Sequence, residues 1–276
     1  MKINKFLYWL LIVILVALFL ISGTFIVRYA IDALQQKDEY DQLAAMVEQA
    51  RSDSATPSEP TDPFQLDEPA GPEQPTAPTE PTEPSILPEY ASLYELNPDM
   101  VGWMTIEGTP INYPVMQTPD RVDYYLKRNF NKEQSAHGCL YVRESCDVFA
   151  PSDNVTIYGH HMKDGSMFTS LKKFRSQSFW EEYSTINFDT LYEHHTYTIF
   201  AVFTTTASIG EGFPYHQFED AEDQAEFDNF VATCKKLSLI DTGITPEYGD
   251  KIICLSTCEY SQTNGRLVVA AVRDTE

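Results

Sequence analysis

The chain has 276 residues, enough for one sizeable domain with accessory segments. Its formal net charge is −22, and every acidic residue follows Arg28, so a basic surface for nucleic acid is excluded. The five cysteines are odd in number and irregularly spaced, which argues against a disulfide framework. Because the chain has no Cys-x-x-Cys pair, HExxH motif or phosphate-binding GxxxxGK-S/T loop, no metal or nucleotide cofactor is expected.

The N-terminal segment predicts a membrane anchor. Residues 6–27 form an almost unbroken apolar run, long enough for a spanning helix and longer than a usual signal-peptide core. Lys2 and Lys5 precede it, which favours a cytoplasmic 1–5 and an outward-facing remainder. The alternative is a cleaved signal peptide, with small residues at 22–24 near a cut site. The length of the run favours the retained anchor.

Two accessory segments follow the apolar run. Apolar residues recur irregularly over 28–51, which predicts a juxtamembrane helix or stalk, with self-association only weakly indicated. Residues 52–88 are rich in Pro, Thr and Glu and cannot bury a core, so a disordered, partly polyproline linker is predicted. At about 3 Å per residue it could reach about 100 Å. It is either a spacer holding the domain off the membrane or a tail without function, and only shortening it distinguishes the two.

Residues 89–276 form the predicted folded domain. Alternating or β-branched apolar runs predict strands at 101–106, 111–116, 138–142, 155–158, 196–206, 251–258 and 267–272. Helical segments are predicted at 90–97, 123–130, 167–174 and 219–239, the last with an apolar face of Phe227, Phe230, Val231, Cys234 and Leu237. Many strands, few helices and no β-α-β alternation predict a mainly β barrel or sandwich with peripheral helices.

The last two predicted strands carry the candidate chemistry. The first ends at Cys258, a polar connection containing Asn264-Gly265 follows, and Arg266 opens the second. Adjacent strands joined in this way hold a thiol beside a guanidinium, and a nearby positive charge favours the nucleophilic thiolate. The best candidates for the missing base are His160 and His161, which follow Gly159 where an upstream strand ends.

These motifs resemble those of a known family. Leu255-Ser256-Thr257-Cys258 with Arg266, together with Tyr158-Gly159-His160-His161-Met162, resembles the class B sortases, the cysteine transpeptidases of Gram-positive cell surfaces. The resemblance covers about 88–273. It implies a sortase-like β-barrel of about eight strands with peripheral helices, including an N-terminal helix and a long helix before the cysteine strand.

The resemblance also implies roles for individual residues. Cys258 is the nucleophile, and His160, directly after glycine, is the acid and base, with His161 as the fallback. Arg266 donates hydrogen bonds to the substrate carbonyl and its developing oxyanion without losing its charge. Three further residues are expected around the thiol: the backbone N–H of Glu259 as a second oxyanion donor, and Ser256 and Thr257 in the pocket wall.

Each residue also has an ordinary structural interpretation. A cysteine is most often a small buried apolar group. Cys254, on the same strand face as Cys258 but inside the apolar run, is expected in the core, and so is Cys234. A disulfide between Cys139 and Cys146 is a further alternative. Arg266 would otherwise be a solvated charge at a strand edge. A metal site built from the histidine pairs at 160–161 and 194–195 is disfavoured, since adjacent histidines rarely converge on one ion.

The expected reaction is transpeptidation at the outer membrane face. By the resemblance, the enzyme cleaves a C-terminal LPxTG- or NPxTN-like sorting motif of exported surface proteins after threonine, through a thioacyl intermediate. The product passes to an amine of a peptidoglycan precursor or a pilin. Specificity is expected around 204–218 and in the 219–239 segment.

Two other functions are considered. A membrane-anchored cysteine hydrolase of cell-wall peptides is disfavoured, because related hydrolases usually place the cysteine at a helix N-terminus, upstream of the histidine. A non-enzymatic surface display module requires an unreactive Cys258.

Overall fold

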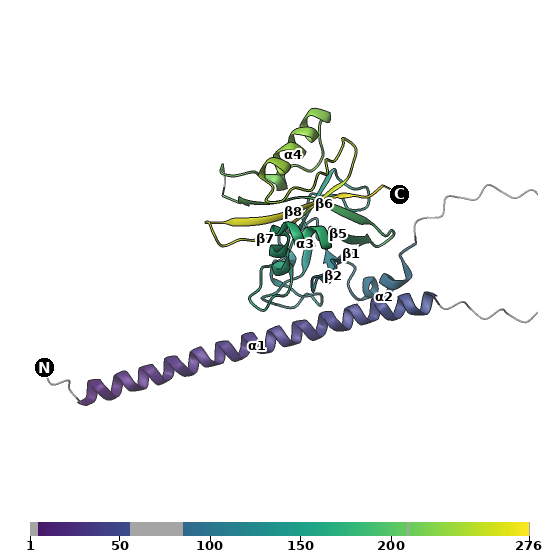
Figure 1. Ribbon diagram of the computed structural model, residues 1–276. Coiled ribbons are helices and arrows are strands. Elements are labelled where there is room, and N and C mark those ends of the chain that lie inside the picture. The colour runs from purple at the N-terminus through teal and green to yellow at the C-terminus, as the bar shows by residue number, and fades with distance from the viewer. Residues whose placement is uncertain (1–4, 56–84, 209, 276) are drawn as a thin grey trace, which may run out of the picture.

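A computed structural model describes residues 5–55, 85–208 and 210–275. The chain begins with one continuous helix, α1 (Lys5–Ala55), which joins the predicted apolar segment to the predicted juxtamembrane helix. No proline interrupts this stretch, so the helix continues past the apolar run. Its first half extends beyond the domain with exposed apolar side chains, and its second half lies along one side of the domain (Figure 1).

Eight strands close into a barrel in the described part of the chain. They are β1 (Met100–Thr105), β2 (Asn112–Met116), β3 (Leu140–Val142), β4 (Asn154–Tyr158), β5 (Thr185–Thr190), β6 (Thr196–Thr206), β7 (Ile252–Cys258) and β8 (Gly265–Arg273). Their order around the barrel is β1-β2-β3-β4-β7-β8-β6-β5. The pairs β2–β3 and β4–β7 are parallel, and the other strand pairs are antiparallel. The predicted mainly β barrel with peripheral helices is confirmed.

Six further helices surround the barrel in the described part of the chain. They are α2 (Pro88–Leu96), α3 (Gln177–Glu182), α4 (Gln224–Leu237) and the 3₁₀ helices η1 (Tyr124–Lys127), η2 (Phe168–Arg175) and η3 (Tyr215–Gln217). The predicted helical segments at 123–130 and 167–174 are therefore 3₁₀ turns. The long helix before the cysteine strand is α4, which begins at an Asp223 side chain that accepts the Glu226 N–H. Of its predicted apolar face, only Leu237 is exposed.

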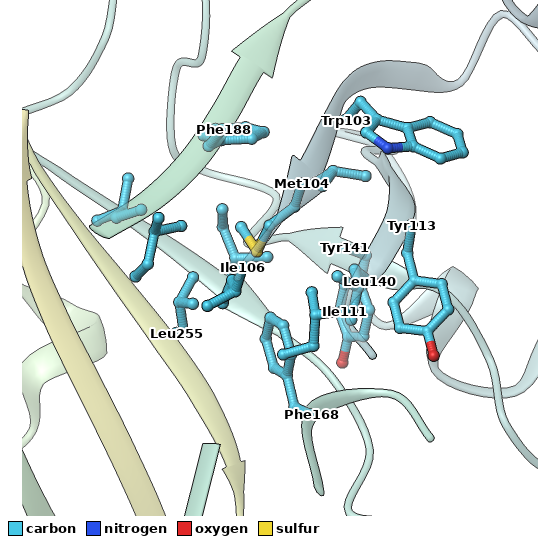
Figure 2. Close-up of a cluster of buried hydrophobic side chains, with 14 of the residues drawn as sticks. Trp103, Met104, Ile106, Ile111, Tyr113, Leu140, Tyr141, Phe168, Phe188 and Leu255 are labelled. Carbon is cyan, nitrogen blue, oxygen red and sulfur yellow. The ribbon is translucent and has the colours of Figure 1, made fainter. Parts of the chain in front are cut away.

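The apolar strands β7 and β8 are buried on both faces. In β8, Leu267, Val269 and Ala271 face the barrel interior. The alternate residues Val268 and Ala270 belong to a second core under α4. Figure 2 shows the interior cluster, in which Trp103, Met104, Phe168, Phe188 and Leu255 are among the labelled side chains. Strand alternation thus explains why both runs are apolar without interruption.

The structure corrects two details of the predicted domain. The Cys139–Cys146 disulfide is absent, because both thiols are free. The Tyr40 hydroxyl donates to Cys139 Sγ at 3.3 Å, whereas Cys146 Sγ contacts the Asn154 carbonyl at 3.6 Å. Strand β5 was not predicted, because its Asn and Asp residues interrupt a clear strand pattern.

The spacer interpretation of the 52–88 segment stays a prediction, and contacts join the elements at the two ends of this segment. Most of this segment, 56–84, lies outside the described residues, but its flanking elements meet. Arg51 near the end of α1 pairs with Glu89 of α2 at 3.4 Å and donates to the Tyr90 hydroxyl at 2.8 Å. Because α1 contacts the barrel before the linker begins, we expect the linker length not to set the distance between the domain and the apolar half of α1.

Candidate active site

The three predicted catalytic side chains line one open cleft of about 320 Å³ at the rim of the barrel. Cys258 ends β7, Arg266 lies at the start of β8, and His160 follows β4. The cleft is also lined by Leu126 of η1 and Tyr215 of η3. Segments far apart in the chain therefore meet at one place.

Strand register explains this meeting. In the antiparallel β7–β8 pair, Cys258 is directly opposite Arg266. In the parallel β4–β7 pair, Tyr158 is opposite Ser256, so both chains leave the sheet at the same edge. The Gly159 N–H continues the pairing by donating to the Ser256 carbonyl at 3.1 Å. The next residue after glycine, His160, is thereby placed beside the end of β7.

Cys258 differs from the other cysteines in exposure. Cys139, Cys146, Cys234 and Cys254 are buried, whereas Cys258 is half-buried. Burial raises the pKa of the Cys254 thiol, and it raises the pKa of Cys146 to about 11. The buried thiols therefore stay protonated at neutral pH, and the structure confirms Cys254 and Cys234 as core residues.

The His160 ring is held by a backbone carbonyl. Its Nε2 lies 2.6 Å from the Leu126 carbonyl oxygen, which can only accept, so Nε2 carries the hydrogen. In the neutral ring, Nδ1 is then the nitrogen that can accept a proton. Gly159 is required before it, since a Cβ there would lie 2.5 Å from the Phe168 ring and 2.6 Å from Leu140.

The neighbouring His161 has a different place. Its Nδ1 lies 3.0 Å from the Cys258 carbonyl oxygen, and its ring packs beside Tyr260 with 5.2 Å between ring centroids. It contacts the backbone that carries the thiol, whereas the ring of His160 lines the cleft. The two imidazoles therefore contact separate backbone carbonyl groups.

Arg266 keeps most of its donors free. Nη1 donates to the carbonyls of Asn264 and Gly265 at 3.3 and 3.0 Å. Within the described ranges, no carboxylate pairs with this guanidinium. The remaining N–H groups are therefore available to an oxygen in the cleft.

The three residues expected around the thiol divide into two groups. Ser256 and Thr257 line the cleft, and Ser256 Oγ lies 2.5 Å from the Tyr215 hydroxyl. The Glu259 N–H, in contrast, donates to the Gly265 carbonyl at 2.9 Å within the hairpin connection. In this structure the Glu259 N–H bonds within the hairpin, and its role as a second oxyanion donor stays a prediction.

Two cleft residues that the motifs did not identify come from the segment before α4. Tyr215 and His216 lie in the 204–218 segment, where specificity was expected. Burial lowers the pKa of His216, and the nearby guanidinium groups of Arg143 and Arg266 lower it further. His216 is therefore kept neutral near physiological pH. Leu126 was also missed, because a backbone carbonyl leaves no signal in the sequence.

A β-barrel whose rim brings together a half-buried thiol, an imidazole and a guanidinium defines the sortase class of cysteine transpeptidases. The family model described as the sortase domain matches residues 104–274. Sortase B of Staphylococcus aureus is 33% identical over 188 residues, covering 67% of this chain and 75% of that protein. Sortase B of Listeria monocytogenes is 33% identical over 183 residues, covering 66% and 72%. The chain therefore belongs to the sortase B family.

Solved structures agree with this assignment. A Staphylococcus aureus sortase B–substrate complex superposes with a TM-score of 0.72 at 26% identity, covering 89% of this chain and 99% of that one. A Bacillus anthracis protein similar to sortase B has a TM-score of 0.68 at 29% identity, covering 88% and 97%. Family membership identifies the chain as a cysteine transpeptidase, which sets aside the hydrolase and display-module interpretations.

Proposed function

We propose that His160, Cys258 and Arg266 form the catalytic set of a membrane-anchored transpeptidase that cleaves sorting motifs. The observation that carries the proposal is their position around one cleft, enforced by the β4–β7 and β7–β8 registers. Cys258 is also the one partly exposed thiol among the five cysteines.

The first half-reaction forms a thioester. The Cys258 thiol gives its proton to His160, and the resulting thiolate attacks the threonine carbonyl of an LPxTG- or NPxTN-like motif. Arg266 donates to the carbonyl oxygen as it becomes an oxyanion. When the tetrahedral intermediate collapses, the C–N bond breaks and the imidazolium gives its proton to the departing amine. The acyl group remains on sulfur.

The second half-reaction forms a new amide. An incoming primary amine enters the cleft, transfers a proton to the neutral His160 ring and attacks the thioester carbonyl. Cys258 then leaves as the thiolate. We propose an amine of a cell-wall peptide precursor as the acceptor, with a pilin lysine as the second candidate. The proposal is supported by a solved sortase B described as a complex with triglycine.

The N-terminal helix supports a location at the outer membrane face. The first half of α1 is long and apolar enough to cross a membrane and is exposed in the structure. We propose that 1–5 lies in the cytoplasm, that 6–27 spans the membrane and that the remainder faces the cell wall. The juxtamembrane helix 28–51 and linker 52–88 then precede the catalytic domain 89–276. Anchoring raises the effective concentration of enzyme, substrate and acceptor when all three are tethered to one surface.

The test offers the full-length enzyme in detergent micelles a panel of fluorogenic sorting peptides, with and without an amine acceptor. The expected result is cleavage after threonine, a thioester adduct on Cys258 by mass spectrometry, and an amide product that requires the amine. A panel that yields neither adduct nor product contradicts the proposal. Release of only the free acid in the presence of every amine contradicts the transferase step.

A further inference from the structure

The second half of α1 is packed on the barrel. Gln36, Tyr40, Leu43 and Val47 are buried, at successive spacings of four, three and four residues, so they form one face of the helix. The Tyr40 ring packs edge-on against Tyr113 of β2, with 5.0 Å between ring centroids. Figure 1 shows this half of α1 alongside β2 and α2. The juxtamembrane helix is therefore part of the folded domain.

The polar contacts of this face converge on one loop, residues 129–139. The Tyr40 hydroxyl donates to the Gly138 carbonyl at 2.6 Å. The Ser135 hydroxyl donates to Gln36 Oε1 at 2.5 Å. All four residues are buried, so these hydrogen bonds define where the loop lies against the helix.

The same loop supports the carbonyl that holds His160. The Cys139 N–H donates to the Tyr125 carbonyl of η1 at 3.1 Å. Gly138 has φ +60°, and a Cβ there would lie 2.6 Å from the carbonyl oxygens of both Tyr125 and Leu126. The loop is thus in close backbone contact with the residue whose carbonyl accepts the His160 Nε2–H.

A second link joins the loop to the turn that follows the catalytic histidine. His137 is 1% exposed, and its Nε2 lies 2.7 Å from Asp164 Oδ2. Its Nδ1 lies 3.5 Å from the Asp32 carboxylate of α1. Asp164 belongs to the turn between His160 and η2, and the Phe168 N–H closes that turn by donating to the His160 carbonyl at 3.0 Å.

We propose that the juxtamembrane half of α1 is a positioning element for the catalytic imidazole, with Tyr40 and Gln36 as its positioning residues. They hold the 129–139 loop, the loop holds the Leu126 carbonyl, and that carbonyl selects the Nε2–H tautomer and the orientation of the His160 ring. The inference rests on the proposed role of His160. The helix that carries the membrane anchor is thereby connected to the catalytic site through a continuous series of contacts.

The experiment uses the full chain in detergent micelles and the variants Tyr40→Phe and Gln36→Leu, singly and combined. Tyr40→Phe keeps the packed ring and removes only the hydroxyl, with its contacts to the Gly138 carbonyl and to Cys139 Sγ. Gln42→Leu is the matched control, because Gln42 is exposed on the same helix and donates to Asp38 within it. Three properties are measured: kcat and KM for a sorting peptide, the pH profile of Cys258 alkylation by iodoacetamide, and Tm.

The expected result is a fall in kcat of about fivefold for each variant at unchanged KM, the effect of losing one hydrogen bond in a positioning chain. The pH profile of Cys258 alkylation shifts in the same variants and stays at the wild-type position in Gln42→Leu. A role in stability alone would lower Tm and leave kcat per titrated active site and the pH profile unchanged, which would contradict the inference.

Wild-type kcat and a wild-type pH profile in the double variant would likewise overturn the inference. The alkylation arm needs no substrate and is read by peptide mass spectrometry at Cys258. A wild-type enzyme that cleaves no sorting peptide therefore contradicts the proposed function. In that case the pH profile of Cys258 alkylation still decides whether α1 positions His160.

Discussion

The two ends of the β7–β8 hairpin have the same strands, the same antiparallel pairing and different surroundings. At one end, Cys258 and Arg266 line an open cleft. Toward the other end, Ile252 and Val272 are opposite each other and buried in the core beneath α4. The strand sequence is apolar along most of its length, so the contrast arises from what covers each end.

The two cysteines of β7 show what this contrast means chemically. Cys254 and Cys258 are four residues apart and share a strand face. Cys254 is fully buried, and burial raises its thiol pKa well above the usual range. Cys258 lies at the open end, opposite an arginine. We therefore expect the two thiols to differ in reactivity, because only Cys258 is partly exposed.

The largest expected effect is the difference in activity between variants of these two cysteines. Cys258→Ala should abolish cleavage of a sorting peptide while leaving Tm close to wild type, because a half-buried thiol is replaced by a smaller apolar group. Cys254→Ala is the control at the covered end, and it should keep kcat while losing about 1 kcal/mol of unfolding free energy to a small cavity. Peptide cleavage by Cys258→Ala at the wild-type rate would contradict the nucleophile assignment.

A second pair of variants compares the two ends of β8. Arg266→Lys should lower kcat/KM about 100-fold, because a point charge cannot reproduce the planar donor fork at a developing oxyanion. Arg273→Lys makes the same substitution at the other end of β8, where Arg273 is opposite Tyr197 of β6. This variant should leave kcat/KM unchanged. Steady-state kinetics measures kcat/KM of both variants and of the wild type. Equal rates in Arg266→Lys and wild type would show that charge alone is sufficient.

The buried thiols should also make stability depend on pH. Burial raises the pKa of Cys146 from 9.0 to about 11. The unfolded thiol therefore ionises first, and the stability that this group contributes is complete below pH 9 and is lost as the pH rises toward 11. The free energy of unfolding is measured with urea under reducing conditions at about pH 8 and about pH 11. Its decrease between the two pH values should be about 2 kcal/mol smaller in Cys146→Ala than in wild type. Identical falls in the two proteins would contradict the burial effect.

The smallest expected effect concerns the linker. Deleting residues 60–80 should leave kcat/KM and Tm at the wild-type values, because α1 and α2 already meet through Arg51 and Glu89. The residues left between the described ends, 56–59 and 81–84, could still reach roughly 30 Å. Loss of activity toward membrane-tethered substrate but not soluble peptide would support a spacer function. A scrambled linker of natural length is the control.

The chemistry was more predictable from the sequence than the supporting structure. The motifs around His160, Cys258 and Arg266 identified the residues that meet in the cleft, because turn residues and strand ends leave local signals. Strand β6 was predicted at 196–206, as observed, since its pattern is continuous and β-branched. Strand β5 was missed because its Asn and Asp residues interrupt a clear strand pattern, and its pairing with β1 and β6 is a tertiary property.

The apolar N-terminal segment and the β-rich domain could be predicted from the sequence alone, because both depend on local composition and spacing. The candidate reacting side chains could be named from the resemblance of their motifs to those of sortases. The three-dimensional structure was needed to show that the juxtamembrane helix packs on the barrel, that the Glu259 N–H donates within the hairpin, and that the Leu126 carbonyl holds the His160 ring. These features join backbone groups and side chains from distant segments. Their partners are chosen by strand register and helix packing, which no short stretch of sequence encodes.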